Sequence, residues 1–158
     1  MAGSNEQAQP GVEVKSTTNG VSLFSGQSVD AANFSNRGTD TAWGGGVRGG
    51  IEWQAMPGVK VGIAGSSRVY MERFTRYSGL FAERGSLDAP ATMQAGVAVD
   101  LRRDVTMMLD YKRIWFSSVR AMSNASDSPG SFGADNGPGF GVQDLNIYKV
   151  AFEWRANP

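Results

Sequence analysis

Hydrophobic and polar residues alternate one by one along much of this chain. In "WGGGVRGGIEWQA", residues 43–55, every second residue is apolar or glycine, while Arg48 and Glu52 lie at the positions between. Successive side chains of a β-strand point to opposite faces, so a period of two predicts a strand with one apolar and one polar face. Residues 43–55 are therefore predicted to form an amphipathic strand.

The same alternation returns in later stretches. After the tight turn "MPG", residues 59–71 read "VKVGIAGSSRVYM"; residues 91–101 and 105–115 flank the turn "RRD"; and residues 145–154, "LNIYKVAFEW", follow a glycine-rich loop. Short turns between alternating segments predict β-hairpins. The pattern thus predicts two hairpins and a fifth strand, with glycines and Pro138 in "GPGFG" allowing a sharp entry into that strand.

The connections between these strands are unequal in length. Turns after Ala55 and Leu101 are short, whereas long polar segments follow Phe74 and Ser117. Short turns at one end and long loops at the other are typical of outer-membrane barrels. The tryptophans fit this arrangement as two aromatic girdles at the membrane interfaces. We expect one girdle at the short turns and one at the long loops, formed by Trp53 and Trp154, and by Trp43 and Trp115.

Composition narrows the chemistry. The 158 residues include 21 glycines, 15 basic and 15 acidic residues, and no cysteine or histidine. The balanced charge gives no indication of nucleic-acid binding, and the missing histidine and cysteine remove the commonest catalytic bases, nucleophiles and metal ligands. The remaining carboxylates lie on separate elements without compact spacing. We therefore expect no enzyme activity, no cofactor and no metal.

Two interpretations of the pattern stay open. Amphipathic strands joined by turns also occur in a soluble β-sheet module that binds an apolar ligand. Strands of roughly ten residues, paired aromatic levels and full charges at mid-strand favour a wall with lipid on one side and a polar lumen on the other. The charges expected to face that lumen are Arg48, Glu52, Asp110, Lys149 and Glu153.

Three pieces of sequence carry a resemblance to a known family. "SGLFAERGSLDAPA", "LDYKRIWFSSV" and "FGADNGPGFGVQDLNIYKVAFEW" resemble the second half of the FadL/OmpP1/TodX family of outer-membrane transporters, over roughly residues 43–158. The last piece is the most specific. It departs from the family pattern at Val142, where tryptophan is common.

The resemblance implies an all-β, antiparallel transmembrane barrel of roughly fourteen strands, with a plug, that passes long-chain fatty acids or aromatic hydrocarbons. Five or six meandering strands cannot close such a barrel, so we expect a fragment: residues 39–158 as partial barrel, and residues 1–38 as strand or external loop. It also implies a Gram-negative outer-membrane location, contact with lipid and lipopolysaccharide, and a monomer when full length. No signal peptide is recognisable in "MAGSNEQAQPGVEV".

Several residues on the expected external loops and upper strands are candidates for substrate binding. Leu80 and Phe81 in "YSGLFAERG", and Phe132 and Phe140 near "GPGFG", offer apolar surface that either captures a hydrophobic solute or packs within the loops. A fatty-acid head group would need a cation, for which Arg68 is the first candidate and Lys112 the second. The lumen charges are interpreted as a structural charge ladder that fills the barrel interior, in preference to a carboxylate-binding site.

Overall fold

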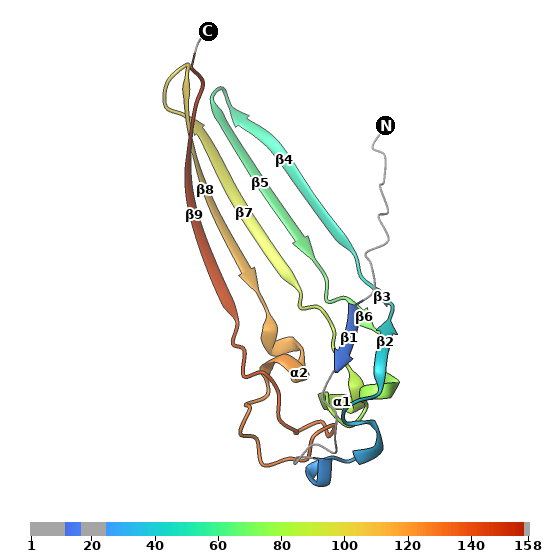
Figure 1. Cartoon of the computed structure of the whole chain (residues 1–158). Coiled ribbons are helices and arrows are strands. Elements are labelled where there is room, and N and C mark those ends of the chain that lie inside the picture. The colour runs from blue at the N-terminus through green and yellow to red at the C-terminus, as the bar shows by residue number, and fades with distance from the viewer. Residues whose placement is uncertain (1–11, 17–24, 157–158) are drawn as a thin grey trace.

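A five-stranded antiparallel sheet forms the body of the structure (Figure 1). This computed structural model describes residues 12–16 and 25–156. The strands lie in the order β4 (Arg48–Met56), β5 (Val59–Ser66), β7 (Thr92–Asp100), β8 (Val105–Ile114) and β9 (Leu145–Trp154). Each strand pairs with its neighbour along the chain, so the predicted meander of two hairpins and a further strand is confirmed.

The register of the sheet gathers apolar residues on one face. Val61 lies opposite Val97, Val97 opposite Leu109, and Leu109 opposite Val150, which makes one apolar row across four strands. The row beside it on the other face contains Gly62, Gly96, Asp110 and Lys149. Because side chains alternate between faces, this pairing keeps the apolar and charged sets apart in the middle of the sheet. At the loop end of β8, Arg113 lies on the same face as Leu109.

The first hairpin is interrupted where the sequence predicted two continuous strands. The segments expected at 43–55 and 59–71 continue past the break as a separate pair, β3 (Gly44–Gly45) and β6 (Tyr70–Met71). At the break the Val47 N–H donates to Ser67 Oγ at 3.0 Å, while the Ser67 N–H donates to the Val47 carbonyl at 2.9 Å. A side-chain oxygen thus replaces a backbone acceptor, and the regular ladder ends there.

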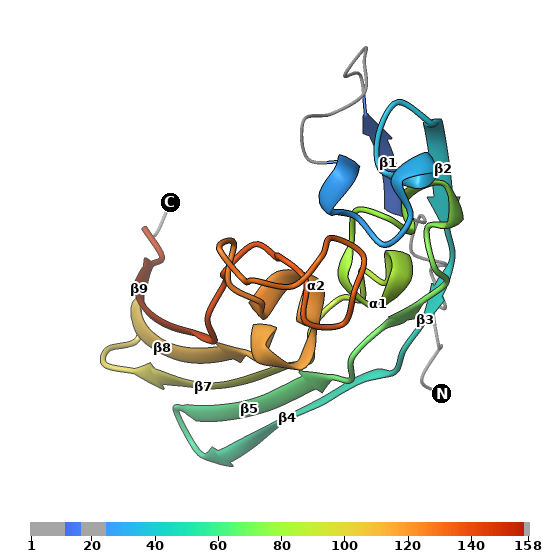
Figure 2. The same cartoon turned by 90° about the horizontal axis from the view of Figure 1, so that it is seen from below.

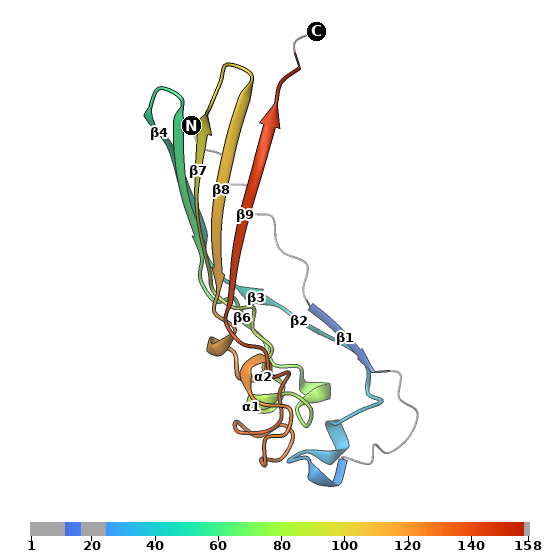
Figure 3. The ribbon, with the colours of Figure 1, turned by 90° about the vertical axis from the view of Figure 1, so that its left-hand side faces the viewer.

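Loops and short helices gather at one end of the sheet, and the short turns and the end of β9 at the other (Figures 1 and 3). The predicted asymmetry is therefore present. We call the long-loop end, comprising residues 25–34, 67–91 and 115–144, the loop layer. Its helical elements are η1 (Ser25–Gln27), η2 (Ala31–Asn33), η3 (Thr75–Tyr77), α1 (Ala82–Gly85), η4 (Phe116–Ser118) and α2 (Arg120–Ser123). None of the helices in the described part of the chain is long and apolar enough to cross a membrane.

Buried residues lie in the loop layer and beside it, not in the five-stranded sheet. The core cluster consists of Ala42, Phe74, Tyr77, Phe81, Ala82 and Ala121, with Met71, Leu80 and Leu87 packed against it. Large apolar side chains of the sheet remain exposed, among them Ile51, Trp53, Ile63, Leu109, Tyr148, Val150, Phe152 and Trp154. Within residues 12–16 and 25–156, no element forms a layer over the apolar face of the sheet.

The sheet is curved and open. Viewed from below, its five strands follow an arc, and β4 and β9 are its two edges (Figure 2). A separate two-stranded sheet pairs β1 (Val12–Ser16) antiparallel with β2 (Gly38–Ala42) beside the loop layer. An open, curved, antiparallel sheet of this kind is a segment of a barrel wall.

We expect Gly85→Ala to destabilise the loop layer by roughly 1–3 kcal/mol. Gly85 has a φ of 95°, and a Cβ there would lie 2.5 Å from the Phe74 carbonyl oxygen. Hydrogen exchange of the loop amides in the full-length protein in detergent would measure the loss. Gly26→Ala is the matched control, since a Cβ there meets no atom within 4 Å. Equal protection in both variants would contradict the assignment of this turn as a structural requirement.

Candidate functional site

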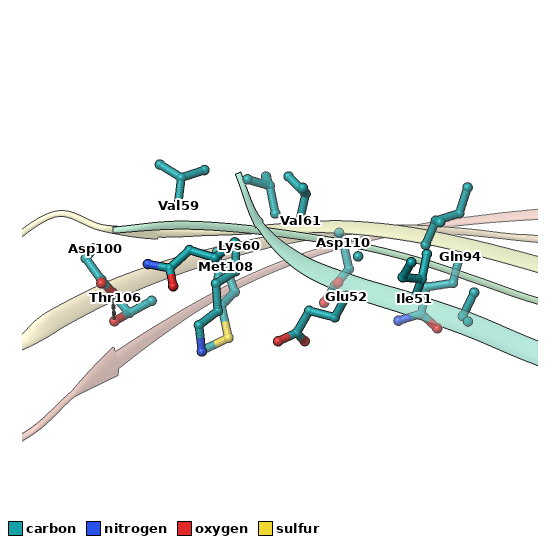
Figure 4. A pocket seen from close by; sticks show the side chains of 18 of the residues that line it. Ile51, Glu52, Val59, Lys60, Val61, Gln94, Asp100, Thr106, Met108 and Asp110 are labelled. Carbon is teal, nitrogen blue, oxygen red and sulfur yellow. Dashed lines mark hydrogen bonds between the residues drawn. The ribbon is translucent and has the colours of Figure 1, made fainter. Parts of the chain in front are cut away.

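The charged face of the sheet lines a broad hollow. Figure 4 shows Glu52, Lys60 and Thr106 on one side of the sheet and Val59 and Val61 on the other. The hollow encloses about 810 Å³ and is open along the side that the sheet does not cover. A curved sheet with its polar face toward such a hollow has the arrangement of a barrel interior seen from one side.

The predicted lumen charges share this face. Arg48, Glu52 and Glu153 line the hollow, and Asp110 and Lys149 lie opposite each other on β8 and β9. Of these five, only Glu153 has an ion-pair partner within 4.0 Å in the described part of the chain, Arg155 at 3.0 Å. The other four charges have no ion pair at this distance among the described residues. The assignment of these residues to a lumen stays a prediction.

Asp110 leans over a glycine of the neighbouring strand. A Cβ built at Gly96 would lie 2.3 Å from Asp110 Oδ1. Any residue larger than glycine at position 96 would therefore displace the Asp110 carboxylate. Gly62 continues the row on β5. The two glycines lie between Glu52 on β4 and Asp110 on β8, and the Asp110 carboxylate occupies the space above Gly96.

The four tryptophans lie toward the two ends of the sheet. Trp53 and Trp154 are near the short turns, and Trp154 Nε1 donates to Asp104 Oδ2 at 3.1 Å. Trp43 and Trp115 are near the loop layer; the Arg113 guanidinium lies 5.7 Å from the ring centre of Trp115. Their positions agree with two aromatic levels, and their contact with a membrane interface stays a prediction.

Arg68 lies in the loop layer beyond the end of β5, and it already has anionic partners. Its Nε donates to Asp88 Oδ2 at 2.7 Å, and its guanidinium also reaches Glu83 and the Ser118 carbonyl. Asp88 is only 4% exposed and accepts the Met71 N–H at 2.8 Å as well. A solute carboxylate would have to compete with these groups for Arg68. Lys112, by contrast, has no ion pair within 4.0 Å in the described segments.

The apolar candidates divide between buried and exposed positions. Phe81 is 8% exposed, and Leu80 packs against the same core, as the packing interpretation predicts. Phe132 stacks edge to face on Phe34 with ring centres 5.2 Å apart. Phe140 is 62% exposed and lies 6.5 Å from the Phe81 ring. Of the four, Phe140 offers the most free surface to a solute.

A polar cluster at the loop end of β8 and β9 was missed by the sequence analysis. Arg113 Nη2 donates to Asp144 Oδ2 at 3.3 Å, and the Tyr111 hydroxyl donates to Asn146 Oδ1 at 2.8 Å. The Ser117 N–H donates to Asp144 Oδ1 at 2.9 Å. This hydrogen bond stabilises the carboxylate and is the largest contribution to the lowered pKa of Asp144. Asp144 thereby ties the start of β9 to the end of β8. No motif distinguishes these residues in the sequence.

The fold is that of a partial, antiparallel β-barrel of the FadL type. Among solved structures, the chain is similar to the toluene transporter TbuX of Ralstonia pickettii, with a TM-score of 0.50 and 19% sequence identity. The match covers 76% of this chain and 34% of that one, so the chain spans about a third of the length of TbuX. No family model and no curated protein matches the sequence.

We expect Asp88→Ala to destabilise the loop layer by roughly 2–4 kcal/mol, because it leaves the Arg68 guanidinium and the Met71 N–H without their buried acceptor. Asp88→Asn keeps an acceptor oxygen and should cost less. Limited proteolysis of the loops in the full-length protein would detect the change. Asp127→Ala, at an exposed loop position, is the control. Similar cleavage rates for Asp88→Ala and Asp127→Ala would show that the buried carboxylate does not hold the loops.

Proposed function

We propose that this chain forms part of the wall and of the external loop layer of an outer-membrane barrel through which hydrophobic compounds diffuse. The observation that carries the proposal is the separation of faces in one open sheet, with large apolar side chains exposed on one face and charges lining a hollow on the other. The process is passive diffusion, and it needs no cofactor and no covalent chemistry.

The apolar face supports a lipid environment. Val150, Phe152 and Tyr148 are each more than 60% exposed, and they neighbour one another on β9. Contiguous apolar surface of this kind is unfavourable in water and stable against lipid acyl chains. The backbone hydrogen bonds of the inner strands are satisfied within the sheet, as a membrane requires. Outer-membrane lipid and lipopolysaccharide are the partners that fit this face, and the full-length protein is proposed to be a monomer.

The proposed solute path combines the loop layer with the hollow. TbuX, whose fold the chain shares, is described as a toluene transporter. The hollow is open on the side that the sheet does not cover, so its lining would form one wall of the passage. Both aromatic hydrocarbons and long-chain fatty acids are included in the proposal. Phe140, with Phe81 beside its ring and with Leu80 and Phe132 elsewhere in the loop layer, would form the capture surface. Lys112, or Arg68 in competition with its partners Asp88 and Glu83, would meet a carboxylate head group.

Uptake by a Gram-negative host that lacks its own hydrophobic-compound transporter would test this function. Cells that express the full-length protein should take up toluene or oleate faster than cells without it. Heat-modifiable migration on gels would establish that the barrel has formed. Equal uptake with a folded barrel would reject the transport proposal. Refolding of the full-length protein to a monodisperse monomer in plain buffer would instead favour a soluble β-sheet module that binds an apolar ligand.

Val97→Arg should destabilise the full-length barrel by ~2–4 kcal/mol, because it places a charge on the lipid-facing row near mid-strand. Gln94→Arg, on the other face of the same strand, should have a mild effect. Urea unfolding in lipid vesicles measures both. Equal, small losses would show that the apolar face does not meet lipid.

Phe140→Ser should slow uptake at low solute concentration, with little change in barrel stability, since the exposed ring contributes little to the loop core. Burial of the ring against a solute is worth roughly 1–2 kcal/mol after the cost of ordering, which corresponds to about a five- to thirtyfold change in apparent affinity. The control is Phe81→Ser, which should disturb the loop core itself. Unchanged uptake by a stable Phe140→Ser protein would move the capture surface elsewhere.

A further inference from the structure

A network of charged side chains joins the two long loops. Glu83 lies between two arginines, with its carboxylate 4.0 Å from the Arg68 guanidinium and 3.7 Å from that of Arg120. Asp88 pairs with Arg68 at 2.7 Å, and Asp135 pairs with Arg120 at 3.6 Å. The network therefore contains one more carboxylate than guanidinium groups.

The backbone at Glu83 is unusual for its residue type. Glu83 has a φ of 56° and ψ of 32°, and Arg84 follows with a φ of 57° and ψ of 53°. Left-handed conformations are uncommon for residues other than glycine, asparagine and aspartate. The surrounding contacts maintain this conformation; the Arg84 N–H, for example, donates to the Gly133 carbonyl at 2.9 Å. The turn holds Glu83 where it can reach arginines from both loops.

The network borders the exposed aromatic surface of the loop layer. The Phe140 N–H donates to the carbonyl of Ala121, the residue after Arg120, and the Phe140 ring lies near Phe81, two residues before Glu83. The network is accessible to solutes, because the side chains of Arg120 and Glu83 are 52% and 31% exposed. A solute that rests on Phe140 would thus have its polar end near these charges.

We infer that Glu83 is a specificity-determining residue, which makes the loop layer favour uncharged hydrophobic solutes over carboxylates of the same length. Two arginines beside an aromatic surface would by themselves attract a carboxylate. Arg68 already pairs with Asp88, and Arg120 with Asp135, so Glu83 is the carboxylate in excess of the two guanidinium groups. An incoming solute carboxylate therefore meets the negative charge of Glu83. This inference rests on the proposed function, since it assigns the solute class that the external loops admit.

Removal of the Glu83 charge provides the test. We expect Glu83→Gln to strengthen the binding of decanoate to the full-length protein in nanodiscs by roughly three- to tenfold, the scale of a partly exposed ion pair. Binding of decanol, which has the same chain and no charge, should stay unchanged. The gain for decanoate should shrink as salt is added, because exposed charges are screened. Empty nanodiscs correct for partition into lipid.

Two further variants keep the result interpretable. Glu83→Asn removes the same charge with a residue that tolerates the left-handed conformation, so it should reproduce the gain even if glutamine disturbs the turn. Glu72→Gln removes an equal charge at an exposed position outside the network and should change neither ligand. Arg84→Gln, combined with Glu83→Gln, tests the neighbouring arginine. The double variant should bind decanoate as tightly as Glu83→Gln alone.

Each outcome bears on one proposal or the other. An unchanged ratio of decanoate to decanol binding in both Glu83 variants would overturn the role of Glu83 and leave the transport proposal standing. A wild-type protein that binds decanoate more tightly than decanol would also overturn it. Failure of the folded protein to bind either compound would reject the proposed function together with this inference.

Discussion

The antiparallel backbone ladder is the constraint on which the other features of the structure depend. Once Val61, Val97 and Leu109 are in register, every side chain of the sheet is assigned to a face, and a slip of one residue would exchange the apolar and charged faces. No residue of the five-stranded sheet is buried as a core residue of a soluble protein would be. The wall is therefore held together mainly by its backbone hydrogen bonds and cross-strand contacts, whereas the loop layer has a small aromatic core of its own.

The wall and the loop layer have different roles in the proposed function. The wall separates an exposed apolar face from a polar hollow, and Gly96 leaves room for the Asp110 carboxylate in that hollow. The loop layer presents the exposed Phe140 ring beside paired charges. In the proposed transport function, solutes would be discriminated at this exposed aromatic surface.

Much of the wall was predictable from the sequence, because a period of two assigns faces without knowledge of any distant contact. The turns at "MPG" and "RRD", the order of the strands and the long loops followed from local signals. The break at Ser67 did not, since a serine hydroxyl that replaces a backbone acceptor leaves the alternation unchanged. Arg68 illustrates the same limit for the site: its place in the alternation suggested a free cation, whereas Asp88 and Glu83, distant in sequence, neutralise it. Such ion-pair partners depend on how the loops pack against one another, which cannot be predicted from the alternation of apolar and polar residues.

The hydrogen bond from the Val47 N–H to the Ser67 hydroxyl separates the regular pairing of the wall from the loop layer. Because the regular ladder ends there, a shift or an insertion in the segment that begins with Arg68 is not transmitted along β5 into the register of the wall. The loop layer can then diverge in sequence while the strands retain their pairing. A wall that keeps its shape while the loops vary in sequence is the expected evolutionary result.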